Sequence, residues 1–254
     1  GKARMSSITV ILNGYRRPDN LALQVEAIKK QTFGAAEIWL WINYHEDFDK
    51  SDSELLKLGI DKICRNNHNW KYMGRFSLAM LAQTDFVALF DDDTIPGEKW
   101  FENCLKTYEK NPGILGGVGL HLQSRENYMD HVRFGWPSSN EEVMEVDLVG
   151  HAWFVNRDDL KYIWAERPYT WETGEDIHFS AMAQKYGKIK TYVPPHPPLE
   201  RNKSSSLFGY ELGVDDKTES VTNHNIFFPL RDRCIQHYTK NGWSLFLERK
   251  NDSS

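Results

Sequence analysis

The first half of the chain alternates short apolar runs with segments whose apolar residues recur at helical spacing. The apolar runs have the length and density of buried strands and lie at 7–14, 37–43, 62–64 and 86–90. The helical patterns lie at 20–30, 52–58, 72–83 and 100–109. Strands that alternate with helices in this way predict βαβ units, and therefore an α/β fold with a mostly parallel sheet and helices on both faces.

The second half of the chain is richer in strand-like pieces and less regular. Strand patterns lie at 113–123, 128–134, 146–156 and 189–193, and helical patterns at 158–166, 175–187 and 231–240. We expect the strands to form a smaller mixed sheet. Residues 199–222 are rich in Asn, Lys, Ser and Gly, which predicts a mobile loop and a candidate lid. Residues 1–6 are interpreted as an expression-vector remnant and left out of the fold prediction.

Polar residues follow three of the predicted parallel strands. Asn13 and Tyr15 lie at the end of the first strand, Asn43 ends the second, and 91–93 follow the fourth. The carboxyl ends of parallel strands meet at one edge of the sheet, and ligands bind beyond that edge in open α/β folds. The pattern therefore predicts a pocket there.

Asp91, Asp92 and Asp93 directly follow a buried strand, which needs a physical reason because adjacent carboxylates repel and are costly to desolvate. A divalent cation would remove the repulsion, since Mg²⁺ and Mn²⁺ prefer carboxylate and phosphate oxygens. Alternating side-chain directions would place Asp91 and Asp93 on one side and Asp92 on the other. The alternative is a solvated acidic turn that caps the helix beginning at Trp100. We favour a site for a metal–diphosphate complex.

Composition excludes several classes of protein. The net charge of −5 argues against a general nucleic-acid binder, which would carry a basic stripe. No apolar run is long enough for a membrane span. Cys64, Cys104 and Cys234 are widely spaced, which favours reduced thiols and a cytoplasmic location, with membrane association through further parts of a longer chain left open. The nine Trp and thirteen Phe suit both a packed core and a site that stacks sugar rings.

In these motifs the sequence resembles the GT-A fold glycosyltransferases of the broad family-2 type. The segments that carry the resemblance are NGYRRPDNL (13–21), QTF…EIWLWIN (31–43), NHNWKYMGRFSLAM (67–80), DDD-x-x-P-G-x-x-W (91–100) and GEDIHFSAMAQKYG (174–187). The resemblance implies a GT-A type Rossmann-like domain. We expect a nucleotide-sugar-binding half at 7–98, an acceptor-binding and catalytic half at 99–198, and a C-terminal loop and closing helix at 199–254.

The resemblance also implies an activity, which is metal-dependent transfer of a sugar from a UDP- or GDP-sugar to a hydroxyl of a glycan or other acceptor. The expected cofactor is Mn²⁺ or Mg²⁺, and the metal contacts are expected from Asp93 and His196. Arg75 suits a diphosphate, because a guanidinium can hold two phosphate oxygens. The residues expected to contact the donor are Asn13, Tyr15, Arg16, Asn43, Asn67, Arg75, Asp91 and Asp92.

For the acceptor side, the resemblance points to the acidic pair that begins the 175–187 helix. Asp176 is the expected base that takes the acceptor proton, and Glu175 is expected to support acceptor binding. The alternative is that both acids only complement the helix dipole. His151, Trp153 and Trp171 are expected to contact the acceptor.

Two questions stay open from the sequence. Direct displacement with inversion is favoured, but the DDDT and GEDI motifs also resemble exostosin-like transferases, which retain configuration. The rival classes are a sugar nucleotidyltransferase and a non-enzymatic glycan- or calcium-binding module. The first needs a Gly-rich loop where this chain has NGYRRP, and DDDTIPGEKWFE lacks the alternating ligands of an EF-hand loop.

Overall fold

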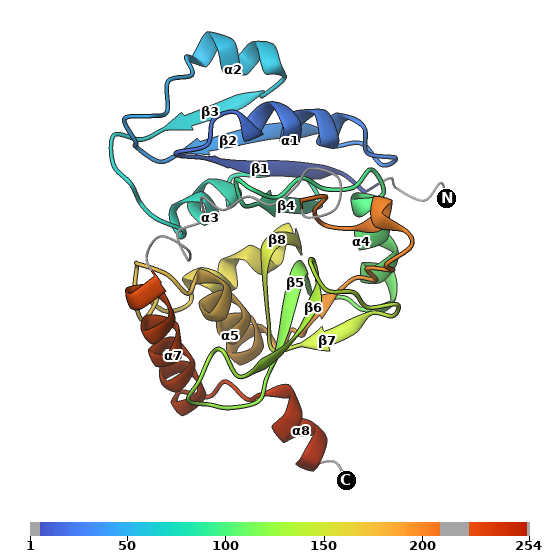
Figure 1. The fold of residues 1–254 in the computed structure, drawn as a ribbon, viewed down its shortest axis with the longest axis vertical. Helices are drawn as coiled ribbons and strands as arrows, with labels where there is room; N and C mark the ends of the chain where they lie inside the picture. Colours follow the sequence, from blue (N-terminus) through green and yellow to red (C-terminus); the bar gives the residue numbers. More distant parts are fainter. Residues whose placement is uncertain (1–5, 209–223, 253–254) are drawn as a thin grey trace.

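The computed structural model describes residues 6–208 and 224–252. One sheet of nine strands runs through the molecule in the order β3-β2-β1-β4-β8-β5-β9-β7, with β6 paired to β5 (Figure 1). The strands are β1 (Ile8–Gly14), β2 (Glu37–Ile42), β3 (Lys62–Arg65), β4 (Phe86–Phe90), β5 (Ile114–Leu122), β6 (His131–Gly135), β7 (Met144–Val146), β8 (Leu148–Asn156) and β9 (Thr191–Val193).

The helices cover both faces of this sheet. They are α1 (Asn20–Lys29), α2 (Asp52–Leu58), α3 (Gly74–Ala79), α4 (Trp100–Lys110), α5 (Glu175–Gly187), α7 (His224–Lys240) and α8 (Phe246–Asp252), with 3₁₀ helices η1 (Arg157–Trp164) and η2 (Arg201–Lys203). Alternate residues of β1 explain the two layers. Val10 packs in one core with helices α1 and α4, whereas Ile11 packs in the other with α3, η1 and α5.

The parallel half of the sheet lies within residues 7–98, the segment for which the sequence predicts nucleotide-sugar binding. β1 pairs in parallel with both β2 and β4, and β2 pairs in parallel with β3. The second half is mixed as expected, because β8 lies antiparallel to β4 and β5 while β9 is parallel to β5. Because β8 is antiparallel to β4 and Ala152 pairs with Phe90, the carboxyl ends of β1, β2 and β4 lie at the edge of the sheet where β8 begins.

Several boundaries differ from the sequence prediction. The predicted 72–83 helix is only Gly74–Ala79, and the predicted 158–166 helix is the 3₁₀ helix η1. The predicted 146–156 strand is divided at Asp147, whose carboxylate accepts hydrogen bonds from the backbone of Leu122 and Phe246. These differences arise because a buried polar residue and short turns end elements that the apolar pattern alone would continue.

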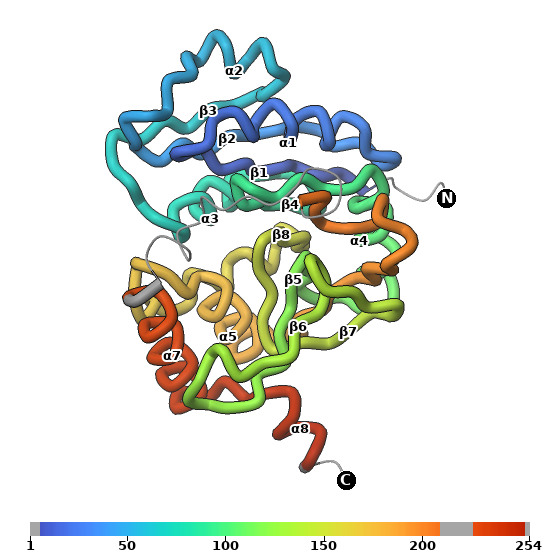
Figure 2. Tube along the Cα trace, in the orientation of Figure 1, coloured from blue at the N-terminus to red at the C-terminus, as the bar shows by residue number. Residues whose placement is uncertain are grey.

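The C-terminal region holds more helix than the pattern predicted. α7 begins at His224 and not near residue 231, and Pro229 lies inside it. α8 was not expected from the sequence. Figure 2 shows the chain of α7 running alongside α5, where Cys234 and Ile235 pack with Ile177 in a third apolar cluster. The expression-vector prediction for residues 1–6 and the loop prediction for 199–222 fall largely on residues 1–5 and 209–223, which lie outside the described residues.

Candidate functional site

A cavity of about 430 Å³ lies at the predicted edge of the sheet. The turn after β4, the start of α3, strands β6 and β8, the start of α5 and helix α7 all contribute to its walls. Most of the predicted site residues line it, although they come from segments far apart in the sequence. They are Asn13, Tyr15, Arg16, Asn43, Arg75, Asp91, Asp92, Asp93, His151, Glu175 and Asp176.

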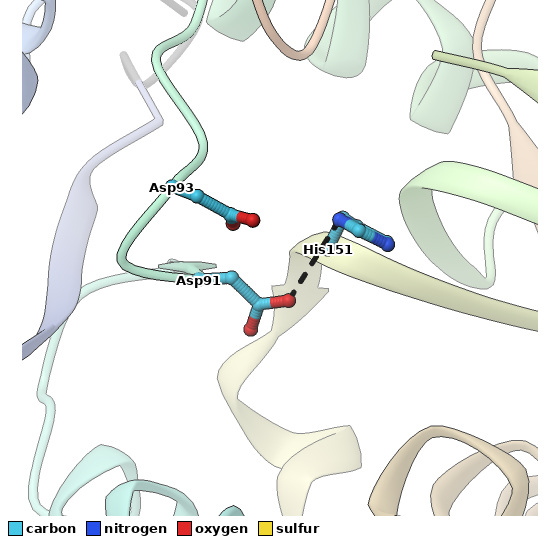
Figure 3. A group of neighbouring side chains, drawn as sticks. All are labelled: Asp91, Asp93 and His151. Atoms are coloured by element: carbon cyan, nitrogen blue, oxygen red, sulfur yellow. Dashed lines mark ion pairs between the residues drawn. The ribbon is translucent and has the colours of Figure 1, made fainter. Parts of the chain in front are cut away.

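Asp91, Asp93 and His151 form a group that could hold a metal ion. One ligand atom from each residue lies within 4.8 Å of the others, and Figure 3 shows the three side chains converging from the β4 turn and from β8. His151 Nδ1 is buried, has no hydrogen-bond partner among the described residues, and lies 3.9 Å from Asp91 Oδ2. Burial lowers the pKa of His151, so its imidazole is neutral and available as a ligand. The two carboxylates suit a hard divalent cation such as Mn²⁺ or Mg²⁺, and the added imidazole nitrogen favours Mn²⁺.

The backbone holds this group in place. His151 has a φ of +66°, a left-handed conformation that is costly for a residue with a Cβ. Helix α1 fixes the aspartate turn, because the Gln24 side-chain amide donates to the carbonyl oxygens of Asp91 and Thr94. A strained backbone conformation, and side-chain hydrogen bonds that fix a turn, are typical of functional sites.

Asp92 faces a different partner from Asp91 and Asp93. Its carboxylate accepts hydrogen bonds from Arg17 and forms an ion pair with it. Burial raises the pKa of Asp92 to about 6, and the Arg17 charge opposes that rise. Arg17 Nη1 also lies 4.0 Å from Asp93 Oδ2, so one arginine neutralises this side of the acidic turn.

Arg75 joins the two acidic groups of the cavity. It is almost fully buried at the start of α3, with Nη2 2.7 Å from Asp91 Oδ1 and 3.9 Å from Glu175 Oε1. The Trp153 ring lies beneath it, 4.9 Å from the guanidinium carbon. Trp153 is buried and packs edge-on against Phe76, so it supports Arg75 from inside the core.

Glu175 and Asp176 begin α5 after Gly174, whose φ of +83° lets the chain turn into the helix. Burial and the neighbouring Asp176 charge together raise the pKa of Glu175 to about 8, against the opposing charge of Arg75. Asp176 Oδ2 lies 2.6 Å from Nη2 of Arg231, which reaches it from α7. Burial lowers the pKa of Arg231, but the charge and hydrogen bond of Asp176, together with Tyr128 and Glu175, outweigh that effect and the net pKa is raised. At neutral pH the site thus holds a protonated Glu175 beside an ion-paired Asp176.

Asn43 and Asn69 organise the side of the cavity next to β1 and β2. Asn43 is 2% exposed, and its side chain accepts from Trp70 N and donates to the Lys71 carbonyl oxygen. Asn43 therefore shapes the loop before α3. Asn69 lines the cavity and donates to the Tyr15 hydroxyl at 3.1 Å.

Four of the predicted residues do not line this cavity. Asn67 is exposed, and Asn69, two positions later, takes its place in the wall. Trp153 lies in the core, and Trp171 is 50% exposed on the surface. The geometry also separates His196 from Asp93, so the metal group contains His151 in its place.

His196 is committed to contacts inside the protein. Its Nδ1 donates to the Pro194 carbonyl oxygen at 2.8 Å, and its Nε2 lies 3.0 Å from the Ser205 hydroxyl. Burial lowers its pKa to about 4, which leaves the ring neutral. His196 therefore ties the turn after β9 to residues 204–206 and has no nitrogen left for a cation.

The sequence prediction missed several residues that line the cavity. The most consequential is Arg231, which lies 55 positions after its partner Asp176 and belongs to no recognisable local motif. The others include residues of the loop before α3, of the β5–β6 region and of α7. Among them are Asn69, Lys71, Tyr72, Tyr128, Met129, His131, Arg133, Phe227 and Phe228.

The fold is an α/β domain with a polar cavity at the carboxyl edge of its parallel strands, and the comparisons with known proteins name its family. Residues 9–164 match the sequence pattern of glycosyl transferase family 2. The matched segment covers more than half of the 254 residues, so the chain belongs to glycosyltransferase family 2. The expected family and GT-A fold class are thereby confirmed. The match ends before α5 and α7, and so it does not include Glu175, Asp176 or Arg231.

Two similar proteins extend this result. A glucosyl-dolichyl phosphate glucuronosyltransferase of Haloferax volcanii is 26% identical over 117 residues, which are 44% of this chain and 37% of that protein. Crystal structures of S. aureus TarS (residues 1–349), alone and in complex with UDP, share the fold with a TM-score of 0.55 at 16% identity. That alignment covers 74% of this chain and 58% of TarS. The chain thus spans well under two thirds of either relative.

No helix within the described ranges 6–208 and 224–252 has the length and apolar character needed to cross a membrane.

Proposed function

We propose that the chain is a metal-dependent glycosyltransferase that moves a sugar from a nucleoside diphosphate to an acceptor hydroxyl. The observation that carries the proposal is the group of Asp91, Asp93 and His151 in one cavity with the acidic start of α5. Membership of family 2, and the similarity to a protein solved with UDP, support a nucleotide-sugar donor.

The donor would bind at the β1–β4 side of the cavity. Tyr15 and Asn69, joined by their hydrogen bond, are placed for the nucleoside, together with Arg16. Asp91, Asp93 and His151 would hold Mn²⁺ or Mg²⁺, which when bound neutralises the charge of a departing diphosphate. Arg75 is buried between Asp91 and Glu175, where its charge faces Asp91 and its side chain links the two sides of the cavity.

Asp176 is the proposed general base for an inverting, direct displacement. Its side chain lines the cavity and is oriented by the contact with Arg231, and a general base must lie within reach of the acceptor hydroxyl. Glu175, with a pKa of about 8, is protonated at neutral pH and can donate a hydrogen bond to the acceptor. Glu175 is thus placed as a hydrogen-bond donor to the acceptor, beside the Asp176 carboxylate that faces Arg231. After the acceptor oxygen bonds to the anomeric carbon, the proton rests on Asp176 and the nucleoside diphosphate leaves.

Isothermal titration calorimetry tests this proposal. UDP and GDP are titrated into the wild-type chain with and without Mn²⁺, and into Asp93→Asn. Asp158→Asn is the control, because its carboxylate is 78% exposed and lies outside the cavity. We expect one nucleotide to bind only with Mn²⁺, Asp93→Asn to lose that binding, and the control to keep it. Binding of neither nucleotide, or equal binding with and without the metal, would overturn the proposal.

A further inference from the structure

Three arginines that are buried or half-buried in the cavity wall each face a carboxylate, whereas the half-buried Arg133 does not. Arg17 faces Asp92, Arg75 faces Asp91 and Glu175, and Arg231 faces Asp176. Arg133 lines the same cavity, yet among the residues that the structure describes it forms an ion pair with no carboxylate.

Arg133 is also removed from solvent. It is half-buried, and its Nε is buried without a hydrogen-bond partner in the described part of the chain. Burial, together with the like charge of Arg231, lowers the pKa of Arg133, while Tyr128 raises it. Arg16, the comparable arginine on the donor side, is exposed and so is neutralised by water. A half-buried guanidinium without a counter-charge is costly to maintain, and an entering anion would remove that cost.

The surroundings of Arg133 suit an acidic sugar. Arg133 pairs across β6 and β5 with Leu120, which in turn pairs with Leu148, and all three line the cavity. The aromatic rings of Tyr128, Phe227 and Phe228 line the same cavity, and such rings stack on the apolar face of a sugar.

This wall lies close to the candidate chemistry. His151 of the metal group interacts electrostatically with Asp91 and with both Arg133 and Arg231. An anionic group held by Arg133 would therefore belong to the transferred sugar or to the adjoining part of the acceptor.

We propose that Arg133 is a specificity residue that binds a carboxylate or phosphate group carried by the transferred sugar or by the acceptor. The proposal rests on the proposed function, because it places this subsite beside a nucleotide-sugar site. A guanidinium donates two parallel hydrogen bonds to either anion, which gives geometric selection as well as attraction.

Calorimetry with matched neutral and acidic probes tests this inference. The donor arm compares UDP-glucose with UDP-glucuronate in the presence of Mn²⁺, or GDP-mannose with GDP-mannuronate if the chain binds GDP. The acceptor arm titrates methyl glucoside, methyl glucuronide and glucose 6-phosphate into protein saturated with nucleotide and Mn²⁺. Each arm uses the wild type, Arg133→Gln, and the control Arg167→Gln, which removes one exposed positive charge outside the cavity. Thermal melting confirms that each variant is folded.

We expect the wild type to prefer the acidic probe in one arm by about ten- to a hundredfold, the range of one charge-assisted contact. Arg133→Gln should lose that preference, and Arg167→Gln should keep it. A preference in the donor arm places the anionic group on the transferred sugar, and a preference in the acceptor arm places it on the acceptor. The inference is overturned if the wild type has no preference in either arm, if Arg133→Gln keeps it, or if Arg133→Gln weakens plain nucleotide equally. Failure of nucleotide and Mn²⁺ to bind the wild type would instead overturn the proposed function, and the inference with it.

Discussion

Removing the Arg231 side chain tests whether helix α7 is part of the site. Arg231→Met keeps an unbranched side chain against Tyr128, whose ring centroid lies 4.2 Å from the guanidinium carbon, but deletes the charge that faces Asp176. The Arg231 and Asp176 side chains are only 4% and 13% exposed. Breaking a buried ion pair from one side costs about 3–5 kcal/mol, because the remaining charge is left without a partner.

The structure places this pair near the lower end of that range, since Asp176 keeps some exposure. We expect Arg231→Met to lower the free energy of unfolding by about 3 kcal/mol. Asp176→Asn should cost about 1–2 kcal/mol, because an amide can still accept a hydrogen bond and the loss of the Asp176 charge lets Glu175 ionise and face Arg231. The double variant should cost about 2–3 kcal/mol less than the sum of the single variants.

Urea unfolding followed by tryptophan fluorescence measures these differences by linear extrapolation. The control is Arg125→Met, which breaks an ion pair with Glu248 on the exposed surface and should cost less than about 1 kcal/mol. Additive losses in the double variant, within about 0.5 kcal/mol, would refute the claim that Arg231 acts through Asp176.

Three further predictions concern single groups. Glu175 has a pKa raised from 4.5 to about 8, so the folded state holds a proton that the unfolded state releases, and stability falls as pH rises through that window. Glu175→Gln lacks this titration, so its unfolding free energy minus that of the wild type should increase between about pH 5 and about pH 8.5 in urea unfolding. A difference that stays constant with pH would contradict the raised pKa. In calorimetry, His151→Asn should weaken Mn²⁺-dependent nucleotide binding about ten- to a hundredfold, whereas a folded His196→Asn variant should bind like the wild type. Weaker binding by His196→Asn and unchanged binding by His151→Asn would instead support His196 as the metal ligand. Ser51→Ala removes the capping box of α2 and should cost about 1 kcal/mol in urea unfolding, against no measurable loss for exposed Ser53→Ala.

The sequence was sufficient to predict the parallel half of the fold, because its signals are local. The apolar runs fix the strands, and the polar residues after β1, β2 and β4 must meet where parallel strands end. Asn13, Asn43 and Asp91, which follow these strands, line one cavity.

The rest of the site depends on how distant segments pack. The sequence favours His196 as the metal ligand and His151 as an acceptor contact. Only the packing shows that His151 Nδ1 has no partner among the described residues, whereas Pro194 and Ser205 occupy both nitrogens of His196. Arg231 and Arg133 reach the cavity through helix α7 and strand β6, whose positions no local spacing predicts. Tertiary contacts determine which of these residues reach the cavity, and a single sequence carries no signal for those contacts.

The most direct test of the central claim is anomalous scattering from crystals grown with Mn²⁺ and the nucleoside diphosphate that the chain binds. The account predicts one manganese peak coordinated by Asp91, Asp93 and His151 and bridged to the diphosphate. A manganese peak beside His196, or a diphosphate bound away from the aspartate turn, would contradict it.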